Sequence, residues 1–259
     1  MFLLEIDFKF IDSQSVVSIV NGIAAGIGDD TKQVLQKEGI NARYSTSEKY
    51  IKWDLLYRNI RKNLRNSHII MDFAKIPGWT LLPLFDSIEG NLYLIMKENR
   101  FDSILKTHNK RKSLHYIEDA IRTFNKGIES YKQTSLFEDK EETDALSKVL
   151  EGILLDLSLD RQLVKKFAVI LFDELNGELT AVRCCLVDSN YNIVKKEDWS
   201  QYIEHNNSVI TERVSSDEEL PSMLNELDLT DKAKRKIGQD HNLTEERNTK
   251  EDNEQAGNK

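Results

Sequence analysis

Residues that could form covalent or metal cross-links are scarce in this chain of 259 residues. Its two cysteines, Cys184 and Cys185, are adjacent, so they cannot build a disulfide framework or a four-thiolate zinc site. The five histidines show no ligand spacing, such as a pair four residues apart on a helix. We therefore expect no metal and no other cofactor, and a reducing cytoplasm is the simplest location.

Long hydrophobic runs are also absent. The longest nearly apolar stretch, Val16 to Ile27, has about twelve residues, whereas a helix needs roughly twenty to cross a bilayer. The first ten residues include Glu5 and Asp7 and no basic leader, which is not typical of a signal peptide. We expect no membrane anchor and no membrane partner.

Three sequence motifs of common enzyme classes are missing as well. The chain has no phosphate-binding loop, no dinucleotide fingerprint and no Gly-x-Ser-x-Gly elbow. Their absence argues against nucleotide-driven and α/β-hydrolase chemistry.

Apolar residues make up 39% of the chain and occur in periodic runs, which excludes disorder throughout. Spacings of three and four predict amphipathic helices, which we place at residues 12–27, 30–38, 47–66, 98–107, 114–131 and 146–157. In the first of these, glycines at positions 22, 26 and 28 are expected to weaken and end the helix. The first ten residues are typical of a strand.

Turn residues between apolar runs predict two hairpins. Gly90 divides residues 79–96, and Pro83 within the first of these strands suggests an edge strand or a bulge. Asn176 and Gly177 form the strongest hairpin signal, between residues 167–172 and 179–187, and a third strand follows at 193–194. The fold class is therefore α+β, with antiparallel β-hairpins packed against amphipathic helices.

Three regions follow from these patterns. Residues 1–135 form an N-terminal α+β region with a basic surface, and residues 136–205 add a helix and a β-meander packed on it. Residues 206–259 are polar and acidic, which predicts a largely disordered tail. The two hairpins are weakly alike in sequence, so a duplicated unit is one interpretation.

Charge is distributed unevenly along the chain, although the whole carries a net charge of −8. Residues 58–126 contain 13 basic and 7 acidic residues, a net of +6, whereas residues 138–259 contain 16 and 28, a net of −12. Lysine and arginine bind a nucleic-acid backbone by releasing its counterions. The candidate binding residues are Arg58, Arg61, Lys62, Arg65, Lys110, Arg111 and Lys112. The alternatives are a solvated flank and pairing with the acidic half or an acidic protein partner.

Enzymatic alternatives rest on a few carboxylates and one histidine. Asp86, or the group Asp173, Glu174 and Glu178, could serve a metal-dependent nuclease, in which carboxylates hold the cation beside a lysine. Lys97 ends a predicted strand, but Ile95 stands where such a nuclease needs a carboxylate. His115 follows a basic loop and could act as the acid or base of a ribonuclease.

Three segments resemble an uncharacterised protein family of low-GC Gram-positive bacteria and their phages and mobile elements. They are Ile51–Asp54, Leu94–Phe101 and Lys110–Tyr116, within a resemblance that covers about residues 45–205. The resemblance implies a cytoplasmic bacterial or phage setting and carries no assigned activity. With the charge distribution, it favours a binding or regulatory protein of defence, mobile-element or toxin–antitoxin type over an enzyme.

Overall fold

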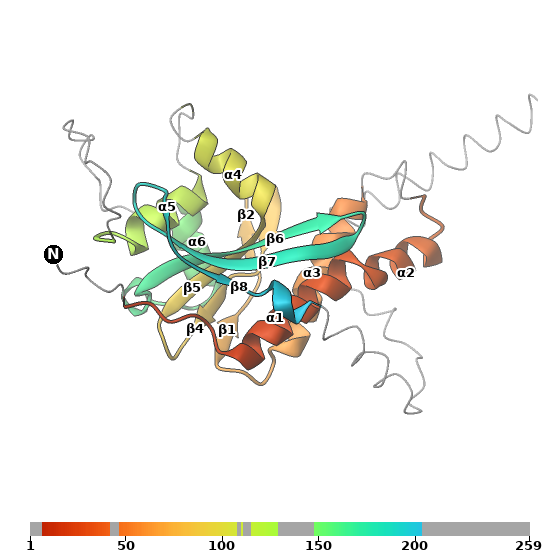
Figure 1. Cartoon of the computed structure of the whole chain (residues 1–259), viewed down its shortest axis with the longest axis horizontal. Helices are drawn as coiled ribbons and strands as arrows, with labels where there is room; N and C mark the ends of the chain where they lie inside the picture. Colours follow the sequence, from red (N-terminus) through yellow and green to blue (C-terminus); the bar gives the residue numbers. More distant parts are fainter. Residues whose placement is uncertain (1–6, 42–46, 108–109, 111–114, 129–147, 204–259) are drawn as a thin grey trace, which may run out of the picture.

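A six-stranded mixed sheet with helices on both faces forms the body of the protein (Figure 1). The computed structural model describes residues 7–41, 47–107, 110, 115–128 and 148–203. The α+β class is confirmed. The expected tail, residues 206–259, lies outside the described residues. Residues 7–12 belong to no strand, and the rest of the expected first strand, residues 1–6, is not described.

The main sheet has the strand order β1-β4-β5-β6-β7-β8. Its strands are β1 (Ile69–Met71), β4 (Leu84–Asp86), β5 (Asn91–Lys97), β6 (Lys166–Leu175), β7 (Glu178–Val187) and β8 (Ile193–Asp198). All neighbours are antiparallel except the central pair β5 and β6, which is parallel. A separate two-stranded ribbon is formed by β2 (Ala74–Ile76) and β3 (Trp79–Leu81).

Both expected hairpins are present. Gly90, between β4 and β5, has a φ of 75°, and Asn176 and Gly177, between β6 and β7, have φ values of 53° and 78°. Positive φ at both central residues matches the twist of the flanking strands. The expectation for Pro83 is wrong, because it lies outside the strands, where the chain leaves β3 for β4, and β4 is flanked by β1 and β5.

The parallel pair requires a long connection across one face of the sheet. The connection carries three helices, α4 (Glu98–Lys106), α5 (Tyr116–Phe124) and α6 (Lys148–Asp156). α5 ends earlier than the sequence suggested, and Asn125 follows it as the C-cap.

The other face is covered by two helices from the N-terminal part, α1 (Ser13–Ile27) and α3 (Glu48–Asn63), and α2 (Asp29–Lys37) packs against α3 in a separate apolar cluster. The Asp12 side chain caps α1 by accepting hydrogen bonds from the backbone of Gln14 and Ser15. α1 continues through Gly22 and Gly26 and ends at Gly28, its C-cap, so of the three glycines only the last ends the helix. Gly22 and Gly26 lie against α3, where a side chain would not fit.

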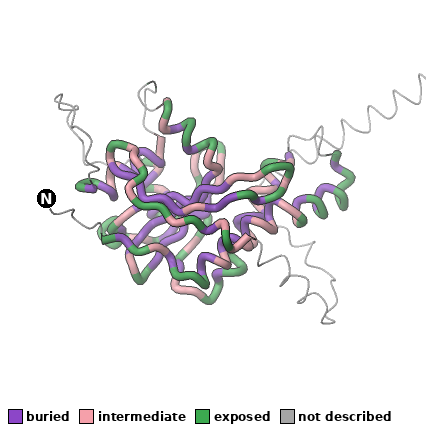
Figure 2. Tube along the Cα trace, viewed as in Figure 1, coloured by how far each residue is buried: buried purple, intermediate pink, exposed green. Residues whose placement is uncertain are grey.

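Successive side chains along each strand point to opposite faces of the sheet, which divides the core into two layers. Tyr93 and Ile95 of β5 pack with α1 and α3, whereas Leu92 and Leu94 pack with α4, α5 and α6. Figure 2 shows the central strands buried along most of their length. The strands of the two expected regions, residues 1–135 and 136–205, therefore belong to one sheet between two helical layers.

Candidate functional site

The helix α3 turns an apolar stripe inward and a basic flank outward. Tyr57, Ile60 and Leu64 are buried in the core shared with α1 and the sheet. Arg61 and Lys62, at neighbouring positions on the helix, are exposed, as is Arg65 just beyond its end. The expected amphipathic character of this helix is confirmed, since its exposed flank carries cations.

Arg58 differs from the other cations of this flank because it is held by the neighbouring helix. Its Nη2 lies 3.3 Å from Oδ2 of Asp30 in α2. The same oxygen accepts a 2.7 Å hydrogen bond from the Asn59 side chain. Arg58 therefore links α3 to α2, and its charge is compensated within the fold.

Arg61 lies beside an exposed aromatic ring. Its guanidinium carbon is 5.2 Å from the centroid of the Phe73 ring, and 37% of Phe73 is exposed. Nη2 of Arg61 also approaches Oδ1 of Asp72, at 3.6 Å, with both side chains about half exposed. A cation over an aromatic face gains about 0.5–1 kcal/mol at exposed sites. Arg61, Lys62, Arg65 and Phe73 together are called the α3 basic flank below.

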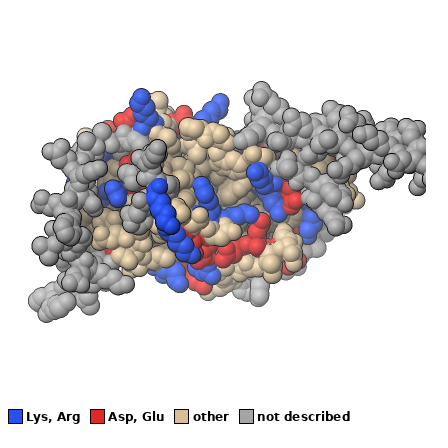
Figure 3. All heavy atoms as spheres, turned by 90° about the horizontal axis from the view of Figure 1, so that it is seen from above, with Lys and Arg blue, Asp and Glu red and all other residues tan. Residues whose placement is uncertain are grey.

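The second part of the expected basic surface lies elsewhere. Lys110 follows α4, which packs on the other face of the sheet from α3. Arg111 and Lys112 lie outside the described residues. On the face seen in Figure 3, basic and acidic side chains are interleaved. Of the expected binding residues, the structure therefore groups Arg58, Arg61, Lys62 and Arg65 and separates Lys110 from them.

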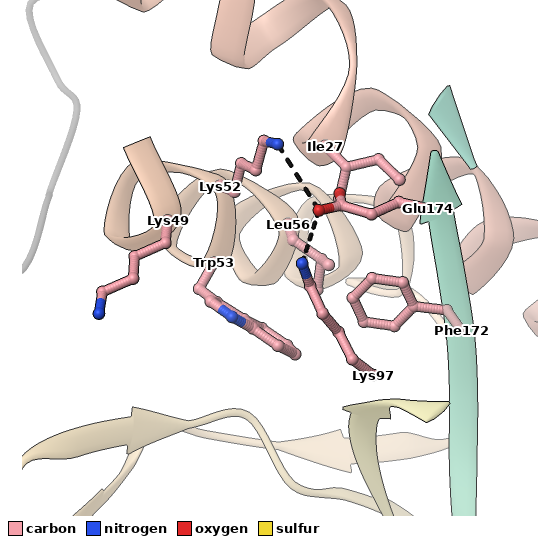
Figure 4. A pocket seen from close by; sticks show the side chains of 8 residues that line it. All are labelled: Ile27, Lys49, Lys52, Trp53, Leu56, Lys97, Phe172 and Glu174. Atoms are coloured by element: carbon pink, nitrogen blue, oxygen red, sulfur yellow. Dashed lines mark hydrogen bonds and ion pairs between the residues drawn. The ribbon is translucent and has the colours of Figure 1, made fainter. Parts of the chain in front are cut away.

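A small pocket lies on the opposite side of α3, against the carboxyl ends of β5 and β6 (Figure 4). Its cavity of about 20 Å³ has room for roughly one water molecule. Oε1 of Glu174 lies 2.5 Å from Nζ of Lys97 and 3.6 Å from Nζ of Lys52. Trp53 and Phe172 form its aromatic wall, with ring centroids 5.5 Å apart.

Sequence reasoning did not pair Lys97 with Glu174, because they are far apart in the chain. The parallel register places Lys97 opposite Phe172, so Glu174 follows just beyond. The other carboxylate oxygen of Glu174 is buried and has no hydrogen-bond partner among the described residues. Lys52 lies in α3, Lys97 in β5 and Glu174 in β6, so these three charges link the helix to both central strands.

The carboxylates considered for a nuclease do not converge. Asp86 is buried and its Oδ1 accepts hydrogen bonds from the backbone of Ile88 and Glu89, so it shapes the turn before β5. Oδ2 of Asp173 lies 3.8 Å from Nη1 of Arg183, while Glu174 pairs with Lys52 of α3 on the other face of the sheet. In the described ranges, no group of three or more His, Cys, Asp or Glu residues could hold a metal ion.

His115, the ribonuclease candidate, begins α5. Its Nδ1 accepts a hydrogen bond from the backbone of Ile117, and Glu118 completes a capping box by bonding the His115 backbone. Its ring centroid lies 4.2 Å from that of Tyr116. These contacts give His115 a role in starting the helix.

The two cysteines point to opposite faces of β7, as the alternation of a strand predicts. Cys184 packs in the core with α1 and α3, and Cys185 packs with α4, α5 and α6. Burial raises the pKa of Cys184 well above its ordinary value and raises that of Cys185 to about 11. Neither thiol is a ready nucleophile, because the thiolate is the reactive form.

In the described part of the chain, no helix has the length and apolar character that crossing a membrane requires.

Comparisons with other proteins give one match. No curated protein and no solved structure matches the chain. Residues 9–247 match DUF5986, a family of unknown function. The match covers most of the chain, so this protein belongs to the DUF5986 family.

Proposed function

We propose that this protein binds single-stranded nucleic acid through the α3 basic flank. The observation that carries the proposal is the guanidinium of Arg61 over the exposed ring of Phe73, next to exposed Lys62 and Arg65. The three cations would contact phosphates, and Phe73 would offer a face on which a base can stack. Arg58 is left out of this set because it is hydrogen-bonded to Asp30, whereas Arg61 approaches Asp72 only at 3.6 Å between half-exposed side chains.

The combination of charge and aromatic surface favours a single strand over a duplex. Cations alone bind any nucleic-acid backbone and lose affinity as salt rises. An exposed ring adds about 1–3 kcal/mol per stacked base, and only unpaired bases offer a free face. The proposal therefore includes a preference for single strands over duplexes, which electrostatics alone would not produce.

A binding role has more support than cleavage. The nuclease candidates Asp86, Asp173 and Glu174 are engaged in turns or ion pairs of the fold, and His115 caps a helix. We further propose that the protein acts in the cytoplasm of a low-GC Gram-positive bacterium or its phage, in defence, mobile-element or toxin–antitoxin regulation. The family resemblance and the basic flank support this setting.

Fluorescence anisotropy of labelled RNA and DNA tests the binding. Single strands and duplexes are titrated with the full chain between about 50 and 200 mM salt, over which phosphate binding weakens strongly. The variant Lys62→Ala/Arg65→Ala should weaken binding to every sequence and lower the salt slope by about 2. Phe73→Leu should weaken binding to single strands and leave duplex binding unchanged.

The matched control is Lys37→Ala, which removes an exposed cation from the last turn of α2. It should leave binding close to that of the natural chain, and circular dichroism should show that all variants are folded. Absence of binding to any strand at 50 mM salt, or equal losses in Lys37→Ala and the α3 variants, would contradict the proposal.

A further inference from the structure

The described chain ends on the same layer as α3. Trp199 is buried in the core that α1 and α3 share with the sheet, and Tyr202 and Ile203 pack against that core. The chain therefore leaves the body on the face covered by α1 and α3, not on the face covered by α4, α5 and α6.

The sequence that follows complements the α3 basic flank in charge and in polarity. Asp217, Glu218 and Glu219 are consecutive acids, and Leu220 follows them directly. Further apolar residues come at spacings of three and four, namely Met223, Leu224 and Leu227. The family match continues through this segment to residue 247, so the segment is part of what defines the family.

We propose that residues 217–227 bind in cis to the α3 basic flank and compete there with nucleic acid. The three acids would pair with Arg61, Lys62 and Arg65, and Leu220 would cover the exposed part of Phe73. This inference rests on the proposed function for its regulatory consequence, because the segment would occupy the surface that binds phosphates.

Chain length permits this contact. The residues from 204 to 216 can span up to about 43 Å when extended, while a body of this size has a radius of gyration of roughly 15 Å. A short tether gives an effective concentration in the millimolar range, so even weak pairing keeps the segment bound. Nucleic acid must then displace it, which lowers the apparent affinity.

The competition is tested with the full chain and a matched control. Asp217→Asn/Glu218→Gln/Glu219→Gln should bind single-stranded RNA roughly fivefold more tightly than the natural chain. Glu251→Gln/Asp252→Asn/Glu254→Gln removes the same charge outside the family match, and it should leave affinity unchanged. If both variants increased the affinity for RNA equally, the effect would come from net charge alone, and this would overturn the inference.

Docking itself is tested without nucleic acid. A photo-crosslinking amino acid in place of Leu224, followed by mass spectrometry, should give intramolecular crosslinks to residues 58–75. Crosslinks between two chains, crosslinks elsewhere on the body, or none would overturn the inference. Failure of the proposed function would give a different result: the crosslink to α3 would form, but no variant would bind nucleic acid.

Discussion

Gly26 of α1 lies directly against Leu56 of α3, so that a Cβ atom at position 26 would be only 2.4 Å from the Leu56 Cα. Gly22, one turn earlier, is in the same relation to Ile60, whose Cγ1 would be 2.5 Å from such an atom. The two helices therefore touch through their backbones. This close approach fixes where α3 lies and hence where its basic flank is presented.

Replacing Gly26 by alanine should lower the free energy of unfolding by about 1–3 kcal/mol, the usual cost of overpacking. Alanine is the better helix former by nearly 1 kcal/mol, so a loss here must come from the contact with Leu56. The control is Gly152→Ala in α6, where an added Cβ would meet nothing within 4 Å. Urea denaturation should show that the control is unchanged or more stable, and similar results for both variants would contradict this account.

Glu174 should be needed to hold two lysines together at the carboxyl ends of the parallel strands. Glu174→Gln leaves Lys97 without its carboxylate partner, whereas Lys52 keeps Glu48 at 2.9 Å, and we expect a loss of about 1–3 kcal/mol. Glu178→Gln removes an exposed acid four residues away and should change the stability little. Restoration of stability in Glu174→Gln by Lys97→Met would support the pairing, and its absence would count against it.

Asn125 joins α5 to two strands through a fully buried amide. Its Nδ2 donates to the carbonyls of Phe167 and Val187, each at 2.7 Å, and its Oδ1 accepts from the Phe167 backbone at 2.9 Å. Asn125→Leu leaves these buried groups without partners, which costs roughly 1–3 kcal/mol for each unsatisfied group. We expect strong destabilisation in thermal unfolding, whereas Asn190→Ala in the loop after β7 should be nearly neutral.

The buried thiols should make stability depend on alkaline pH. The pKa values of Cys184 and Cys185 are raised by burial above the ordinary value of 9.0. The thiols stay protonated in the folded chain and ionise after unfolding, so stability is full below about pH 9 and falls as the pH rises toward 11. Urea denaturation from pH 7 to 10 checks this, and Cys184→Ala/Cys185→Ala should show a shallower decline.

Local patterns were sufficient for the elements but not for their assembly. The spacing of Tyr57, Ile60 and Leu64 identified α3, and Asn176 with Gly177 identified the turn between β6 and β7, because each signal involves neighbours in the chain. The parallel pairing of β5 with β6 joins residues 75 positions apart and has no local signal. The sequence alone predicts that Gly22 and Gly26 weaken the helix. Only the position of α3 shows why a side chain is excluded at these two positions.

The candidate site was predicted only in part, because sequence patterns report neighbours in the chain and not contacts between elements. Periodicity placed Arg58, Arg61, Lys62 and Arg65 on one flank of a helix, and the structure has the first three on α3 and Arg65 just beyond its end. It could not reveal that Asp30 compensates Arg58 or that Phe73 lies under Arg61, because both contacts come from other elements. It also could not show that Lys110 follows a helix on the opposite face of the sheet.

The parallel alignment of β5 and β6 also sets where the chain can change in length. Each half of the sheet is made from strands close in sequence, and the halves meet only after the chain has passed through residues 98–165. The entropy lost on closing such a long connection grows with the logarithm of its length, so doubling it costs only about 0.6 kcal/mol. The stretch between α5 and α6 can therefore become longer or shorter at little cost to the sheet.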